Sequence, residues 1–233
     1  ESDFELSGGS VLTEEISGKI IGGKSDLAYL FRWNEFTAAT TLYFLQKEGL
    51  QIKVAGEEFS FTINGKEEKF TYGTILIPLN SQVLDKEKIY NLIAGQARKT
   101  GIDFYGIPTG LSPVGIDLGS NSFSTLKKPE IALFVGSGTS SSDAGEIWHL
   151  FDQRYHIPIT LVETSQIQSM DIDKYNTIIL PGGAYNNWSK NDIQKLKQWA
   201  SKGGNIVAYK SAASWAAKNE LGKTAYKKQV ERD

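Results

Sequence analysis

The segment Tyr175-Asn-Thr-Ile-Ile-Leu-Pro181 closely repeats an earlier segment of the chain, Tyr72-Gly-Thr-Ile-Leu-Ile-Pro78. The two segments lie 103 residues apart, and the same offset aligns the apolar run Ala28–Phe31 with Ile131–Phe134. It also aligns the helical stretches that follow the two segments. Self-similarity at a fixed offset indicates a repeated structural unit. The sequence therefore predicts two similar units in tandem.

The second unit shows the order of its elements most clearly. Glu130–Val135 is a short apolar run, as expected for a parallel strand that is buried on both faces. A Gly/Ser-rich loop, 136–142, leads from it to an amphipathic helix over Asp143–Arg154, with Asp143 predicted as the N-cap. Further strands are predicted over Ile157–Val162, Thr177–Leu180 and Asn205–Tyr209, and further helices over Asp192–Lys202 and Ser211–Lys218.

The first unit follows the same order of strands and helices. In addition, Asn64-Gly65 is a strong two-residue turn signal and indicates an inserted hairpin. Strands that alternate with helices predict parallel sheets with right-handed crossovers. We therefore expect an α/β fold of two tandem flavodoxin-like units, each with a parallel sheet and helices on both faces.

Glycine, proline and serine gather between the two units, in residues 106–128, which is typical of a connection. We expect an irregular lead-in over 1–26, a first α/β unit over 27–127 and a second over 128–233. One continuous sheet through both units would also fit the repeat, although the connection favours two.

Composition excludes several classes of function. The chain has no cysteine, which excludes thiolate catalysis, disulfides and Cys-based zinc sites. The formal net charge is −2 and no basic stripe stands out, which argues against nucleic acid as a partner. No apolar run reaches the roughly 18–20 residues needed to cross a bilayer, so no membrane span is expected.

Two loops of the second unit fall where parallel α/β sheets bind ligands, beyond the carboxyl ends of the strands. Loop 136–143 resembles a phosphate cradle but lacks a full phosphate-binding motif, and its aspartate would repel a phosphate. Loop 181–188 is rich in aromatic and amide side chains, which suits sugars or peptides. A capped turn and a packed loop are the alternative explanations. The candidate binding residues are Gly136, Ser137, Gly138, Asp143, Gly182, Gly183, Tyr185 and Trp188.

Ser211 is a weak catalytic candidate because it follows a strand that turns directly into a helix, the place of a nucleophile elbow. A serine there needs a base within hydrogen-bond reach. The two histidines, His149 and His156, lie on or just after the first helix of this unit, so a helix N-cap is the favoured role for Ser211. His149 forms i, i+3 pairs with Glu146 and Asp152, but a third ligand on another element is missing and no metal site is predicted.

Several whole segments carry a family resemblance. They are Pro129-Glu-Ile-Ala-Leu-Phe-Val-Gly136, Asp143-Ala-Gly-Glu-Ile-Trp-His-Leu-Phe-Asp152, Tyr155-His-Ile-Pro158 and Tyr175-Asn-Thr-Ile-Ile-Leu-Pro-Gly-Gly183, together with residues 28–55 and 115–120. The set resembles the region downstream of the catalytic domain in large bacterial zinc carboxypeptidases of the carboxypeptidase A-like family. That region is similar to the class I glutamine amidotransferase-like fold, so the resemblance implies two units of this kind.

The resemblance implies a parent that is a zinc metallocarboxypeptidase, often secreted or periplasmic, whose zinc and peptidase domain lie upstream of Glu1. The family's His-x-x-Glu motif is not in this chain, since Asp152 stands three residues after His149 and Ile159 three after His156. Catalytic amidotransferases carry Gly-x-Cys-x-Gly at the elbow, whereas this chain has Lys210-Ser-Ala-Ala-Ser214 with no later histidine. No catalytic residue of either family can therefore be assigned here.

Three functional hypotheses follow. The first is a non-catalytic accessory module that docks on the upstream peptidase domain of the same polypeptide or binds its peptide or glycan substrate. The second is a small-ligand module that binds an anion or a sugar through loops 136–143 and 181–188. The third is a cryptic serine or metal hydrolase, which requires an imidazole beside Ser211 or beside an acidic pair.

Overall fold

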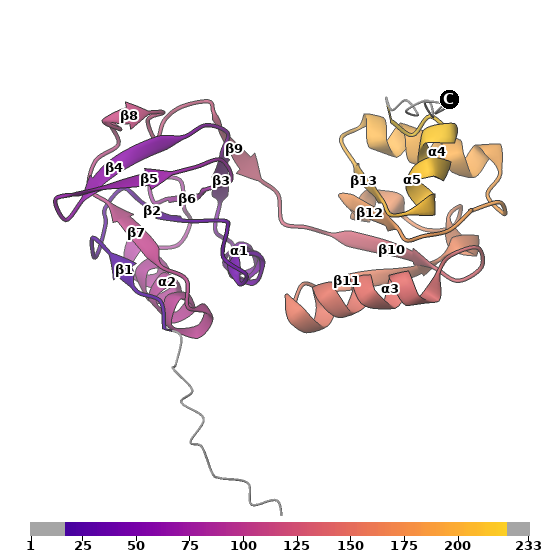
Figure 1. Ribbon diagram of the computed structural model, residues 1–233, viewed down its shortest axis with the longest axis horizontal. Coiled ribbons are helices and arrows are strands. Elements are labelled where there is room, and N and C mark those ends of the chain that lie inside the picture. The colour runs from indigo at the N-terminus through magenta and orange to yellow at the C-terminus, as the bar shows by residue number, and fades with distance from the viewer. Residues whose placement is uncertain (1–16, 223–233) are drawn as a thin grey trace, which may run out of the picture. The chain divides into compact units, whose positions relative to one another are not determined.

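The computed structural model describes residues 17–222, and the chain divides into two compact units, one up to Leu126 and one from Lys127 (Figure 1). Residues 1–16 of the expected lead-in lie outside the described residues. The rest of it is not wholly irregular, because β1 (Ile20–Ile21) pairs in parallel with a strand of the first unit. Each unit is described by itself below.

The first unit is built on a six-stranded sheet in the order β1-β7-β2-β6-β3-β9. All pairings except β1–β7 are antiparallel. The sheet strands are β2 (Ala28–Phe31), β3 (Ile52–Ala55), β6 (Ile75–Pro78), β7 (Phe104–Ile107) and β9 (Phe123–Leu126), with helices α1 (Ala38–Lys47) and α2 (Lys86–Thr100).

The connections of this unit interleave. Helix α1 joins β2 to β3, but β6 lies between these two strands, and α2 joins β6 to β7 around β2. This is the split βαβ arrangement of ferredoxin-like folds. The expected parallel, flavodoxin-like sheet is therefore wrong for the first unit.

A second, antiparallel sheet covers the other face of the first unit. It consists of the hairpin β4 (Phe59–Ile63) and β5 (Lys66–Phe70) together with β8 (Val114–Gly115). The predicted hairpin turn is confirmed, with positive φ angles at both Asn64 and Gly65. Tyr29 and Phe31 pack with the helices, while Ala28 and Leu30 pack with the hairpin. Helices thus cover one face only, which corrects the expectation of helices on both.

The apolar repeat misled the prediction for a physical reason. A strand that is buried on both faces reads as a continuous apolar run, whatever the direction of its neighbours. Strands β2 and β10 (Ile131–Val135) are both of this kind, but β2 pairs antiparallel with β6 and β10 pairs parallel with β12 (Thr177–Leu180). The repeat describes the order of elements and not the topology.

The second unit has the expected parallel sheet, in the order β11-β10-β12-β13. The outer strands are β11 (Ile159–Glu163) and β13 (Asn205–Ala208). From β10 the chain first moves to β11 on one side and then to β12 on the other, so a topological switch point lies between β10 and β12. Short 3-10 turns, Thr164–Gln166 and Ile172–Lys174, lie between β11 and β12.

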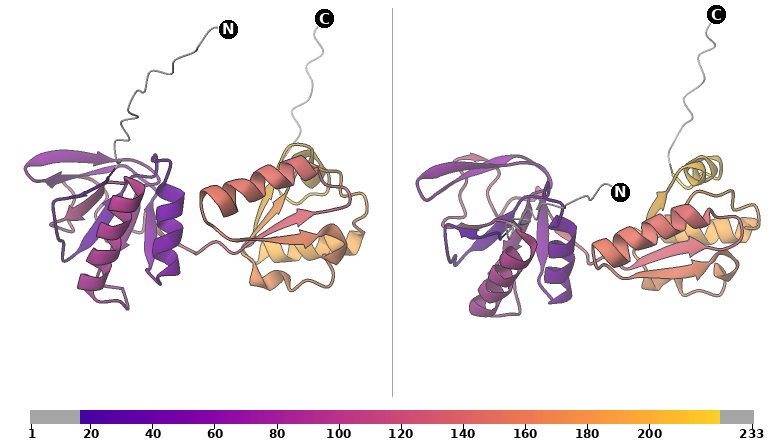
Figure 2. Two further views of the ribbon diagram at one scale, coloured as in Figure 1. Left: turned by 90° about the horizontal axis from the view of Figure 1, so that it is seen from below. Right: turned by 60° about the horizontal axis from the view of Figure 1, so that its bottom comes forward.

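Helices lie on both faces of this parallel sheet (Figure 2). Helices α4 (Lys190–Ser201) and α5 (Ser211–Lys218) contribute to the core on the Phe134 and Leu180 side. Helix α3 (Ser141–Trp148), with a π-helical continuation over His149–Arg154, contacts β10 and contributes no residue to that core.

The helix starts differ from those predicted. The N-cap of α3 is Ser140, and Asp143 is its third residue. Likewise, α4 begins after Ser189, which forms a capping box with Asp192. In both cases the aspartate predicted as the first residue of the helix lies inside its first turn, where a carboxylate is favourable because it faces the positive end of the helix dipole.

Candidate functional site

The two loops predicted to bind a ligand meet at the switch point and hydrogen-bond to each other. The Ser140 amide donates to the Gly182 carbonyl at 2.6 Å, and the Ala184 amide donates to the Gly138 carbonyl at 3.1 Å. Thr139 and Gly183 form an antiparallel bridge between them. The loops thus form hydrogen bonds with each other's backbone amides and carbonyls, and these groups are not free to bind a ligand.

Asp143 is buried beneath this junction. Its Oδ1 atom accepts a hydrogen bond from Lys210 Nζ at 2.7 Å, and its Oδ2 atom lies where a Cβ atom at Gly182 would be. The Asp143 side chain is 7% exposed, whereas that of Lys210 is 56% exposed. Asp143 therefore does not present a bare negative charge to a ligand, because the Lys210 ammonium neutralises it.

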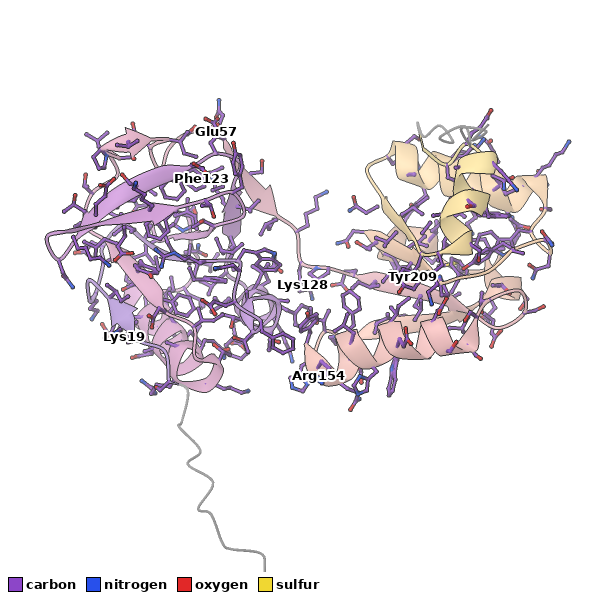
Figure 3. The ribbon with its side chains drawn as sticks, viewed as in Figure 1. Lys19, Glu57, Phe123, Lys128, Arg154 and Tyr209 are labelled. Carbon is purple, nitrogen blue, oxygen red and sulfur yellow. The ribbon has the colours of Figure 1, made fainter. Side chains whose placement is uncertain are left out.

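Lys210 occupies the sharp turn from β13 into α5. Its backbone has φ 49° and ψ −122°, a conformation that L residues seldom adopt. Strained strand-to-helix turns of this kind hold the nucleophile in elbow-type hydrolases. The elbow position here is thus Lys210 and not Ser211. Tyr209, labelled in Figure 3, precedes it with its ring centroid 5.2 Å from Lys210 Nζ.

The charge state of Lys210 follows from its contacts. The hydrogen bond to the Asp143 carboxylate raises the pKa of the Lys210 amine above its ordinary value, so the amine is protonated at neutral pH. A protonated amine has no lone pair with which to attack a carbonyl. At neutral pH, Lys210 can act as a cation or a hydrogen-bond donor, and it is not an activated nucleophile.

Ser211 is the first residue of α5, and the N-cap position belongs to Lys210. The Ser211 hydroxyl accepts a hydrogen bond from the Gly183 amide at 2.9 Å and so ties the Pro-Gly-Gly turn to the helix. The predicted N-cap role is therefore replaced by a bond to a neighbouring loop.

The structure does not bring the histidines to Ser211. His156 precedes β11, at the amino edge of the parallel sheet, while Ser211 follows β13 at the carboxyl edge. Strands of four or five residues separate these edges by roughly 13–17 Å. His149 comes directly after α3, a helix that runs from the carboxyl edge of the sheet toward its amino edge and so leads away from Ser211.

Tyr185 and Trp188, predicted as ligand-binding aromatics, lie in the core of the second unit. Tyr185 is 1% exposed and Trp188 is 7% exposed, with their ring centroids 4.8 Å apart. The Tyr185 hydroxyl donates to the Pro181 carbonyl at 2.8 Å, and Trp188 Nε1 donates to the Thr164 carbonyl at 2.8 Å. Burial raises the pKa of Tyr185 well above its ordinary value. Loop 181–188 is a packed loop.

The remaining candidates line up along loop 136–138. Gly136 and Gly138 both have positive φ angles, and the Ser137 carbonyl accepts a hydrogen bond from Thr164 Oγ1 at 2.9 Å. Gly136 also borders an open pocket of about 300 Å³ between this loop, α3 and β11. Its lining is mostly apolar: Val135, Gly136, Thr139, Ser141, Ala144, Gly145, Trp148 and Leu161.

Sequence reasoning missed both Lys210 and this pocket. The signal for Lys210 is the absence of any loop between the apolar strand and the helix, since such an abrupt turn forces one residue into an unusual backbone conformation. The signal for the pocket is Gly145, a residue without a side chain in the middle of α3.

Among residues 17–222 no group of three or more His, Cys, Asp or Glu side chains is placed to hold a metal ion. Within the same residues no helix is both long and apolar enough to cross a membrane. No protein-family model, no curated protein and no solved structure matches the chain.

Proposed function

We propose that this chain is a non-catalytic accessory module of a zinc-carboxypeptidase-like protein, one that docks or binds without turning a substrate over. The observation that supports it best is the Lys210–Asp143 ion pair, because it occupies the position of a nucleophile in an elbow. The peptidase domain, its zinc and the export of the parent protein are part of the same proposal and rest on the resemblance of sequence segments.

The chemistry of the elbow supports this proposal. Covalent catalysis there needs a nucleophile that can lose its proton to an adjacent base. Lys210 is instead held as a cation by Asp143, and the Ser211 hydroxyl is engaged by the Gly183 amide. The turn thus combines a strained backbone with an ion pair and carries no activated nucleophile.

The ion pair also has a structural role that suits a docking module. It links the first turn of α3 to the start of α5, two helices that lie on opposite faces of the sheet. Together with the hydrogen bonds between loops 136–140 and 181–188, it fixes the carboxyl edge of the sheet. A fixed surface binds a partner with a smaller entropy cost than a mobile one.

The test is an activity assay of the chain alone, without added metal, on a C-terminally unblocked peptide and on glutamine. We expect no turnover above the buffer rate. Lys210→Met and Ser211→Ala provide the matched controls. Turnover by the unmodified chain that either substitution abolishes would overturn the proposal, because it would show that the elbow is catalytic.

A further inference from the structure

The pocket beside β11 has the form of a side-chain site. Its volume of about 300 Å³ is at the small end for drug-sized ligands, and it is open to solvent. Trp148 and Leu161 form its walls and are themselves 38% and 51% exposed. Gly145 leaves its side open, since no atom lies within 4 Å of the position that its Cβ would take. One apolar side chain of a partner would enter this space and contact both exposed residues.

The pocket lies directly beside the free edge of the sheet. Strand β11 pairs with β10 on one side only and is the outermost strand of the sheet that the structure describes. A free edge offers alternate amides and carbonyls to an added strand, and natural proteins often protect such edges with charged side chains, above all lysine, or with proline or a bulge. Strand β11, Ile-Thr-Leu-Val-Glu, contains no lysine, proline or bulge, and its one charged residue is Glu163 at its end.

A carboxylate marks the same edge. Glu163 lies two residues after Leu161 and therefore points to the same face of the sheet. Its carboxylate packs on Gly136, which also lines the pocket. Glu163 is exposed, and none of the ion pairs among residues 17–222 includes it. An unneutralised charge at the rim favours a partner that brings a positive charge.

We propose that β11 and the adjacent pocket bind an extended peptide segment of another polypeptide by strand addition. One apolar side chain of the peptide enters the pocket, and a basic side chain two positions away reaches Glu163, because residues i and i+2 of a strand share a face. This inference does not rest on the non-catalytic role proposed above, since it uses neither Lys210 nor Ser211.

The probe is the heptapeptide acetyl-Ser-Arg-Ser-Leu-Ser-Arg-Ser-amide, which offers the leucine–arginine spacing in both chain directions. Binding is followed on the full chain by NMR shifts of the β11 amides. Gly145→Leu places a side chain in the pocket and should weaken binding on the order of tenfold. Glu163→Gln should weaken it about two- to fivefold at low salt. Ser142→Leu adds the same bulk on α3 outside the pocket lining and should leave the affinity unchanged.

A second peptide, N-methylated at both serines that flank the leucine, keeps the side chains but loses backbone donors. It should bind on the order of tenfold more weakly than the unmodified peptide. No binding of the unmodified peptide at 1 mM or an unchanged affinity of Gly145→Leu would overturn the site. Equal binding of the methylated peptide would overturn strand addition, and an unchanged affinity of Glu163→Gln would overturn the preference for a basic residue.

Discussion

At the scale of single residues, the backbone of Lys210 can be tested separately from its side chain. Lys210→Ala and Lys210→Gly both remove the ion pair to Asp143, but only glycine adopts the positive φ angle without strain. Strain of this kind is of order 1–3 kcal/mol, and the extra unfolded-state entropy of glycine offsets about 0.5–1 kcal/mol of it. We therefore expect the glycine variant to be the more stable of the two in urea unfolding. An alanine variant of equal or greater stability would show that the turn is not strained.

Gly182 makes a second residue-scale prediction. A Cβ atom at this position would overlap the Asp143 carboxylate, so Gly182→Ala must displace a buried group that Lys210 holds in place. We expect the free energy of unfolding to fall by about 1–3 kcal/mol. Gly145→Ala is the control, because its Cβ meets no neighbour and alanine favours a helix by about 1 kcal/mol. Equal effects of the two substitutions would contradict the close contact.

The sequence located the site residues better than it assigned their roles. Loops 136–143 and 181–188 were predicted to follow the carboxyl ends of strands, and the structure adds that they meet at the switch point. The direction of a side chain within a turn, however, depends on local φ and ψ, which periodicity does not reveal. Tyr185 has a φ angle of 48° and its ring lies in the core, while the strained backbone of Lys210 makes it, and not Ser211, the elbow residue.

At the scale of elements, the capping box of α4 makes a prediction. The Ser189 hydroxyl accepts a hydrogen bond from the Asp192 amide at 3.3 Å, and the Asp192 carboxylate accepts one from the Ser189 amide at 2.7 Å. Ser189→Ala should destabilise the second unit by about 0.5–2 kcal/mol in urea unfolding. Ser201→Ala, at the other end of the same helix, should have little effect. If the two substitutions cost the same, the cap would have no special role.

The same capping box predicts how stability depends on acid. Burial acts to raise the pKa of Asp192, but hydrogen bonds from Gln168 and Ser189 outweigh it, and the pKa lies below the ordinary value of 3.8. Because the pKa of Asp192 is lower in the folded state than in the unfolded state, its carboxylate stabilises the fold at pH values above the unfolded-state pKa. This contribution is lost as the pH falls from the unfolded-state pKa through the folded-state pKa. Between pH 5 and 2, the stability of Asp192→Asn should therefore fall less than that of the unmodified chain. Equal losses of stability in Asp192→Asn and in the unmodified chain would contradict the lowered pKa of Asp192.

Elements were easier to predict than their pairing. The apolar runs that became β2, β6, β10 and β12 were all found, because burial on two faces leaves a strong pattern. The direction of pairing depends on whether a third strand is inserted in the sheet between two strands that a helix connects. That insertion depends on contacts between residues far apart in the sequence, which a local pattern does not reveal. Strand β6 lies between β2 and β3 in the first unit, whereas no strand enters between β10 and β11 in the second.

At the scale of the whole molecule, the two units have a similar order of strands and helices along the chain but different sheet topologies. The first unit buries its sheet between helices and a hairpin, and the second buries its sheet between helices on both faces. Each has core clusters formed by its own residues. Because domains with their own cores can in principle fold alone, the boundary between Leu126 and Lys127 is a place where the chain can be divided.

This division predicts that fragments 17–126 and 127–233 each fold alone. The amide NMR spectrum of each fragment should show the chemical-shift dispersion of a folded domain. The boundary itself can be tested with a fragment that ends at Gly119 and lacks β9. That strand pairs with β3, and its Phe123 is 4% exposed, with its ring centroid 5.4 Å from that of Phe59. Compared with fragment 17–126, the shorter fragment should have a free energy of unfolding that is lower by about 3–5 kcal/mol, the cost of removing a buried phenylalanine. The loss of the strand pairing adds to this. Failure of the longer fragment to fold, or equal stability of the two fragments, would show that the units do not divide at this residue.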